Sequence, residues 1–118
     1  MKQFMAVYTG SEASRRKSGW DALDDKTRKA REAEGMQAWI AWGEKHRKAI
    51  VVDGGPLGKT KRTGKDGVTD TRNNLAGYIV VETESHEAAA RMFENHPHFT
   101  IFPGDAVEIM ECLPIPGQ

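Results

Sequence analysis

The chain has 118 residues, with 17 basic and 17 acidic side chains and therefore no net charge. This length suits a single domain, residues 1–118. The balanced charge excludes a global field that would draw the protein to nucleic acid or to a membrane surface. One cysteine excludes an internal disulfide framework and fits a reducing cytoplasm. No apolar run approaches the ~20 residues that a membrane-spanning helix needs.

The first half of the chain predicts a strand, a loop and a long helix. Residues 3–8 alternate as a strand does, and residues 9–19 form a polar segment that we interpret as a loop. A helix is expected from about Asp24 to Lys48, and Gly35 is expected to break or kink it. Its second half carries an apolar stripe at helical spacing, formed by Met36, Trp39, Ile40 and Gly43.

A strand and a hairpin are predicted next. Residues 49–52 are an apolar strand that ends at Asp53. In the glycine-rich stretch that follows, residues 61–63 and 68–72 can pair, with residues 64–67 as the turn between them.

The last third predicts strand, helix, loop and strand. Residues 78–82 are β-branched and aromatic, and Ser85 can cap a helix. The helix has one apolar stripe, formed by Ala89, Met92 and Phe93 and continued by His96. Pro97 stops the helix and favours an extended backbone at His96. Residues 106–112 alternate like a half-buried strand.

The order is thus β-α-β-β-α-β, the split βαβ arrangement of an α+β, ferredoxin-like fold. Two helices cover one face of such a sheet, and the other face must meet water or another protein. Apolar residues suggest that both faces are partly apolar: Met5, Val7, Ile79, Val81, Val107 and Ile109. We therefore expect a homodimer that buries the uncovered face, with the proline-containing tail 113–116 lying across the neighbour.

His96 and His98 flank Pro97 at the helix end. We expect these two side chains to point to opposite sides of the segment, so we do not expect both to serve one site. His96 continues the helix stripe towards the sheet and is our catalytic candidate, whereas His98 is a candidate for substrate binding. The alternative is a packed His96 whose ring bonds a backbone carbonyl. A His-x-His pair also suggests zinc, but further ligands from Asp53, Asp105 or His86 have no diagnostic spacing, so we predict no metal.

Asp53 stands where an apolar strand opens into a turn and is the natural partner for His96. A carboxylate beside an imidazole fixes the tautomer of the ring and stabilises its protonated form. The alternative is a turn role, in which the carboxylate bonds the backbone of its own loop. Gly54 and Gly55 would relax the backbone there and allow a ligand to approach closely.

Three tryptophans remain. We interpret Trp39 as core, and Trp42, four residues before His46, as part of a pocket rim or a dimer interface. Trp20 closes the polar segment and is either a lid over a bound ligand or a ring that packs against the helix start. The basic runs are interleaved with acids, so they indicate a solvated surface rather than nucleic-acid contact.

Several of these motifs, taken in order, resemble the YCII-related (DGPF-type) family. They are Asp53-Gly54-Gly55-Pro56-Leu57, the strand start at Gly77-Tyr78, His96-Pro97-His98 and the last strand with its Leu113-Pro114-Ile115-Pro116-Gly117 tail. The resemblance implies a ferredoxin-like fold that dimerises into an α/β barrel, with an active site built from a histidine and an aspartate. The Asp-Gly-Pro-Phe motif itself is absent; Asp66-Gly67-Val68-Thr69 stands roughly where it would fall.

Two functions are compatible with this resemblance. The first is a small-molecule enzyme without a cofactor, of lyase or isomerase type, in which His96 is the general acid or base and Asp53 orients it. Relatives of the family have been proposed to act as lyases or dehalogenating enzymes on ring compounds. The second is a non-catalytic module that binds a metabolite or serves as an accessory to a regulatory protein.

Overall fold

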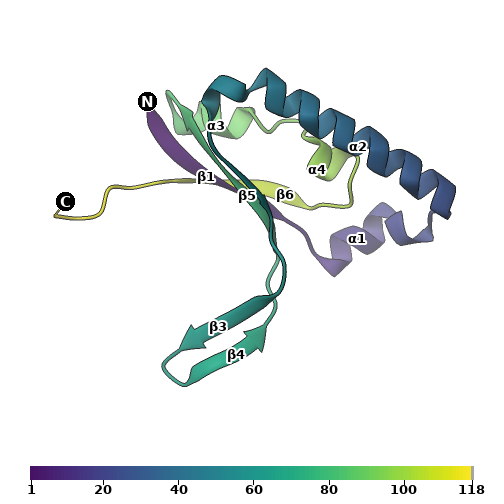
Figure 1. Cartoon of the computed structure of the whole chain (residues 1–118), viewed down its shortest axis with the longest axis horizontal. Helices are drawn as coiled ribbons and strands as arrows, with labels where there is room; N and C mark the ends of the chain where they lie inside the picture. The colour runs from purple at the N-terminus through teal and green to yellow at the C-terminus, as the bar shows by residue number, and fades with distance from the viewer. Residues whose placement is uncertain (118) are drawn as a thin grey trace.

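The computed structural model describes residues 1–117, and its centre is a four-stranded antiparallel sheet. The strand order is β2-β5-β1-β6, and the helices lie on one side of the sheet (Figure 1). The order of two strand–helix–strand units is that of the split βαβ arrangement, so the predicted ferredoxin-like α+β fold is confirmed. The main elements are β1 (Lys2–Thr9), α2 (Asp25–Lys45), β2 (Ile50–Pro56), β5 (Leu75–Thr83), α3 (His86–Arg91) and β6 (Ala106–Glu111).

Strand pairing assigns each apolar residue to one face of the sheet. On β1, the buried residues Phe4, Ala6 and Tyr8 face the helices, so Met5 and Val7 face the other way. Cross-strand partners share a face, and the pairs are Phe4 with Val81, Ala6 with Ile79 and Ile109, and Tyr8 with Val107. Of the six residues expected to cover both faces, four therefore lie under the helices, and Met5 and Val7 lie on the open face.

The segment between β1 and α2 is not the predicted loop, because it contains the helix α1 (Glu12–Ser18). Ser11 caps this helix through its hydroxyl, which accepts the backbone N–H of Ser14 at 3.0 Å, and the Ser14 hydroxyl lies 3.1 Å from the Ser11 backbone nitrogen. Gly19 then ends it with a φ of 73°, a left-handed conformation that glycine adopts readily.

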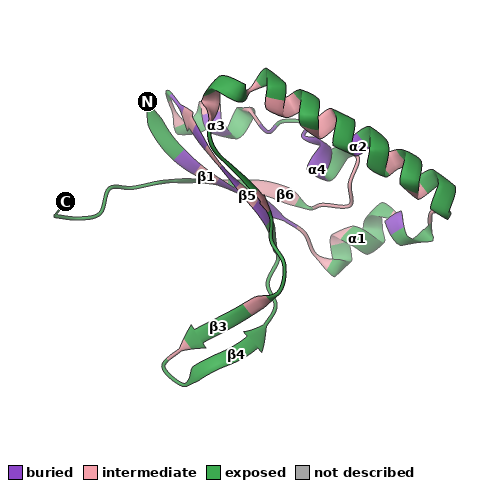
Figure 2. Cartoon of the chain, in the orientation of Figure 1, coloured by how far each residue is buried: buried purple, intermediate pink, exposed green. Residues whose placement is uncertain are grey.

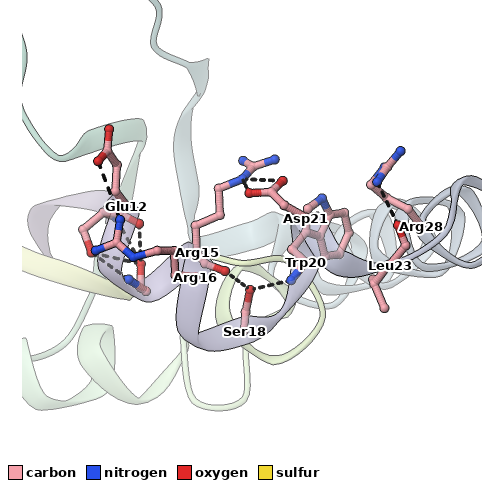
Figure 3. Close-up of polar contacts among 10 residues, drawn as sticks. Glu12, Arg15, Arg16, Ser18, Trp20, Asp21, Leu23 and Arg28 are labelled. Atoms are coloured by element: carbon pink, nitrogen blue, oxygen red, sulfur yellow. Dashed lines mark hydrogen bonds and ion pairs between the residues drawn. The ribbon is translucent and has the colours of Figure 1, made fainter.

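Ion pairs and hydrogen bonds stabilise the turn after α1 (Figure 3). The Arg15 guanidinium bonds the Asp21 carboxylate at 2.9 Å, and the Ser18 hydroxyl donates to the Arg15 carbonyl at 2.6 Å. The same hydroxyl accepts the backbone N–H of Trp20 at 3.2 Å, at the start of the 3₁₀ turn η1 (Trp20–Ala22). The polar composition that suggested a loop thus supplies the caps of a short helix.

Helix α2 begins after Asp24, whose carboxylate accepts the N–H of Thr27, and runs without a break to Lys45. A 3₁₀ turn, η2 (Arg47–Ala49), follows where the prediction extended the helix. Gly35 does not break α2. Gly35 is buried, and a Cβ there would lie 2.5 Å from the Phe102 ring. The absence of a side chain at this position therefore leaves room for the Phe102 ring against α2. Among residues 1–117, no helix is long and apolar enough to cross a membrane.

The predicted hairpin is present and projects from the body of the molecule (Figure 1). It consists of β3 (Thr60–Gly64) and β4 (Gly67–Thr71), and Lys61 pairs with Asp70 across it through an ion pair of 2.7 Å. The tail after β6 also extends away from the sheet, and its apolar side chains Leu113 and Ile115 are 75% and 70% exposed (Figure 2).

Candidate active site

The two histidines lie where the chain passes from α3 towards β6. Asn95 adopts a left-handed φ of 58°, and the following helix, α4 (Pro97–Thr100), begins with proline in its first turn. His96 has the predicted extended backbone and serves as the N-cap, because its Nδ1 accepts the backbone N–H of His98 at 3.0 Å. The predicted loop is therefore a helical turn that an imidazole caps.

This cap fixes the chemical state of His96. Because Nδ1 accepts a hydrogen bond, the neutral ring carries its proton on Nε2. The side chain is fully buried, and burial, aided by the nearby His98 and His46, lowers its pKa from 6.5 to about 4. At neutral pH, His96 is therefore an uncharged imidazole that offers an N–H donor.

His98 has its own fixed tautomer. Its Nε2 lies 2.7 Å from the carbonyl oxygen of Thr9, at the end of β1. A carbonyl can only accept, so Nε2 carries the proton and Nδ1 carries the lone pair. The side chain is buried, which lowers its pKa, while the Thr9 hydrogen bond and the charge of Asp105 act in the opposite direction. Gly104 packs against this ring, and a Cβ at that position would overlap its Cε1 and Nε2 atoms.

Both imidazoles contact the same two aromatic side chains. The Tyr8 ring lies 5.2 Å from each imidazole centroid, and the Trp39 ring lies 4.5 Å from His96 and 6.1 Å from His98. The expectation that the two histidines would point to opposite sides is therefore wrong. It misapplied strand alternation, because residues two apart in an extended segment lie on the same side. In addition, α4 turns the chain at Pro97, and both rings contact Tyr8.

Two buried polar atoms in this cluster have no hydrogen-bond partner among residues 1–117: the hydroxyl oxygen of Tyr8 and the Nε2 of His96. Burial raises the pKa of Tyr8, so its hydroxyl keeps its proton. Sequence reasoning missed Tyr8. The alternation of β1 could have indicated it, because it places the Tyr8 side chain, with its polar hydroxyl, on the helix-facing side near the end of the strand.

A cavity of about 370 Å³ opens beside this cluster. His98 and Asp53 both line it, and its remaining lining is mostly apolar, formed by Tyr8, Met36, Trp39, Gly55, Pro56, Ala76, Gly77, Tyr78, Ile79 and Phe102. His96 is not among the lining residues and packs against Tyr8 and Trp39, which are. The structure thus brings His98 and Asp53 to one cavity. Catalysis by a pair of His96 and Asp53 stays a prediction.

Asp53 is exposed and lies at a bulge in β2, where the register with β5 shifts between Val52 and Gly55. Gly54 has a φ of 63°, and a Cβ there would overlap the carbonyl oxygen of Tyr78. Gly55 has neither constraint and lines the cavity. Of the two glycines, only Gly54 is required by the backbone.

The other tryptophans have different surroundings. Trp20 is buried, with the Phe102 ring 5.9 Å away and the guanidinium of Arg31 over its own ring. Of the two alternatives for Trp20, these contacts fit the ring that packs against the helix start. Trp42 donates from Nε1 to the Met92 carbonyl at 2.8 Å and lines a second cavity, about 530 Å³ in volume, that Asp53 also lines.

Within residues 1–117, no group of three His, Cys, Asp or Glu side chains could hold a metal ion.

No family model matches the chain, and no curated protein matches it. Among solved structures, the chain is similar to 5-chloro-2-hydroxyhydroquinone dehydrochlorinase (TftG) from Burkholderia phenoliruptrix AC1100 in complex with 2,5-dihydroxybenzoquinone. The TM-score is 0.54 at 19% sequence identity, over 94% of this chain and 93% of that chain. This likeness supports the fold over nearly the whole chain, whereas membership of the YCII-related family stays a prediction.

Proposed function

We propose that this protein is an enzyme that transfers a proton on a hydroxylated ring compound, using its own side chains and no metal or bound cofactor. The observation that supports this proposal is the mostly apolar, aromatic-lined cavity that carries one neutral imidazole, His98, and one carboxylate, Asp53. Its volume suits a single six-membered ring with substituents. The structurally similar dehydrochlorinase was solved with such a ring, 2,5-dihydroxybenzoquinone.

The geometry favours His98 over His96 as the base. The lone pair of His96 is engaged by the backbone N–H of His98, whereas the Nδ1 lone pair of His98 has no partner among residues 1–117. In this scheme, Nδ1 of His98 accepts a proton from a ring hydroxyl or ring carbon. The Thr9 carbonyl holds the tautomer, much as a carboxylate does in acid–base sites. The protonated imidazole then returns the proton to another atom of the ring compound or to water in the open cavity, and Asp53, which also lines the cavity, binds a hydroxyl of the ring compound.

The test is turnover of a panel of hydroquinones, chlorinated hydroquinones and hydroxyquinones, followed by absorbance and by chloride release. We expect turnover by the unmodified protein and a loss of about 10²–10⁴-fold in kcat for His98→Gln, because a positioned base contributes that factor. The matched control is His86→Gln, at an exposed histidine that stacks on Phe4 outside the cavity. If a ring binds and shifts the His98 resonances in an NMR titration but is never converted, the protein is a binding module instead.

We also propose a homodimer that forms through the open face of the sheet. By strand alternation, apolar side chains at the centre of this face include Met5, Val7, Val80 and Met110, together with Tyr78, and Glu108, opposite Val7, is a charged exception. Burial of this face against a second copy would gain about 25 cal/mol for each Å² of apolar surface. The extended tail, with exposed Leu113 and Ile115, is long enough to lie across the neighbour.

We expect Val80→Glu to convert the dimer into monomers or aggregates, because it places a charge at the centre of this face. Val68→Glu is the control, since Val68 lies 65% exposed on the projecting hairpin. Light scattering measures both masses. A monomeric unmodified protein, or a dimer that survives Val80→Glu, would contradict the proposed interface.

A further inference from the structure

The hydroxyl of Tyr8 and the Nε2–H of His96 are buried polar groups without a partner among residues 1–117, and they lie on rings in contact at 5.2 Å. We infer that these two groups together bind one oxygen atom of the ring compound, a carbonyl or an ionised hydroxyl. This inference rests on the proposed function and assigns a second set of residues to the same site.

Buried polar groups in folded proteins are nearly always hydrogen-bonded, so each exception calls for an explanation. Within residues 1–117, both exceptions among buried side-chain atoms fall on this one pair of contacting rings. Independent packing defects would have no reason to coincide. A common partner would account for both groups at once, because the two rings are in contact.

The partner must be a hydrogen-bond acceptor. The backbone N–H of His98 holds the Nδ1 of His96 as an acceptor, so Nε2 carries the proton and can only donate. A backbone N–H can only donate, so Nδ1 of His96 has to remain the acceptor. A second proton on the ring would break this hydrogen bond, which caps α4. A cation or an N–H donor is therefore excluded. An oxygen with two lone pairs can accept from both His96 and Tyr8.

The same geometry connects the pair to the cavity. Tyr8 and Trp39 both line the cavity of about 370 Å³, and Trp39 contacts His96 edge-on at a centroid distance of 4.5 Å. Both donor atoms are buried, so the inference requires a side chain at this end of the cavity to move when the ring compound binds. The groups that contact His96 are aromatic and include Phe93 and Trp42, so they favour a flat ring as the ligand.

This arrangement has a chemical use. A neutral imidazole and a phenol that donate to one oxygen stabilise negative charge on that oxygen without protonating it. When the base removes a proton from the ring, the charge that develops is delocalised onto the ring oxygens. His98 would then be the base, while Tyr8 and His96 would bind the oxygen on which the charge appears.

The first test measures binding of 2,5-dihydroxybenzoquinone by calorimetry to the unmodified protein and to Tyr8→Phe. We expect the substitution to weaken binding roughly 10- to 100-fold, because it removes one hydrogen bond to a charged oxygen. The matched control is Thr83→Val, which removes a buried hydroxyl at the other end of β5, outside the cavity, and should leave affinity within about twofold. Thermal unfolding confirms that both variants fold.

The second test follows the Nε2–H proton of His96 by NMR, assigned by its disappearance in His96→Asn. We expect this resonance to move downfield when the quinone saturates the protein. Equal affinity for the quinone in Tyr8→Phe and the unmodified protein, with an unmoved His96 resonance, would overturn the inference, since a buried water alone would then bridge the two groups. That outcome would leave the proposed function intact. Failure of the unmodified protein to bind any ring of the panel would overturn both.

Discussion

Lowering the pH from about 6.5 to about 4 should reduce the free energy of unfolding by roughly 3 kcal/mol through His96 alone. In the folded protein, its pKa is about 4, whereas the unfolded chain binds the same proton near the ordinary value of 6.5. Between these values the unfolded state binds more protons, so stability rises with pH. The contribution is fully present above about 6.5 and is lost as the pH falls through about 4.

Urea unfolding at pH steps from 7 to 4 measures this effect in the unmodified protein and in His96→Asn. Asparagine is a good N-cap whose side-chain oxygen can accept the His98 N–H, and it does not titrate. The variant should be less stable at pH 7 and should lose less stability on acidification. His98, whose pKa burial also lowers, contributes to both curves. Parallel pH profiles for the two proteins would show that His96 is not held neutral by the fold.

Gly54→Ala should lower the free energy of unfolding by roughly 2–4 kcal/mol. The φ of 63° at this position strains any residue with a Cβ, and the added atom would overlap the carbonyl oxygen of Tyr78 and lie 2.7 Å from its carbonyl carbon. These are backbone atoms of a central strand, so they cannot rotate away as a side chain could. The bulge would have to shift, and Asp53 and Gly55 would shift with it.

The neighbouring glycine is the control. Gly55→Ala should change stability by less than about 1 kcal/mol, because φ is not positive there and nothing lies within 4 Å of the methyl group that the substitution adds. Denaturant unfolding of the two variants gives the comparison directly. Equal effects at Gly54 and Gly55 would contradict the role assigned to the bulge. A large loss at Gly54 alone would show that the bulge requires the left-handed conformation at this position.

The sequence predicted the candidate site in part. It located Asp53 at the end of a strand and the two histidines at a helix end, and both Asp53 and His98 line the cavity. It ranked His96 first because the apolar stripe of Ala89, Met92 and Phe93 predicts that this residue points inward, and the ring of His96 is indeed buried. Full burial also keeps that ring out of the cavity lining. Chain periodicity indicates which side chain is buried, but it does not indicate which one reaches a cavity.

The order of the strands and of the two helices α2 and α3 followed from the sequence, because strand alternation, the α2 stripe and the glycines of the hairpin turn are local patterns, whereas α1 and α4 were predicted as loops. The prediction that Pro97 ends this helix was wrong, because α3 already ends at Arg91 and Pro97 begins α4. Three features depended on tertiary structure: the continuity of α2 at Gly35, the cap that His96 provides to α4, and the contact of both imidazoles with Tyr8. Each depends on groups distant in the chain or on the direction of one short turn. Local propensity does not specify such contacts, whereas packing of the helices on the sheet does.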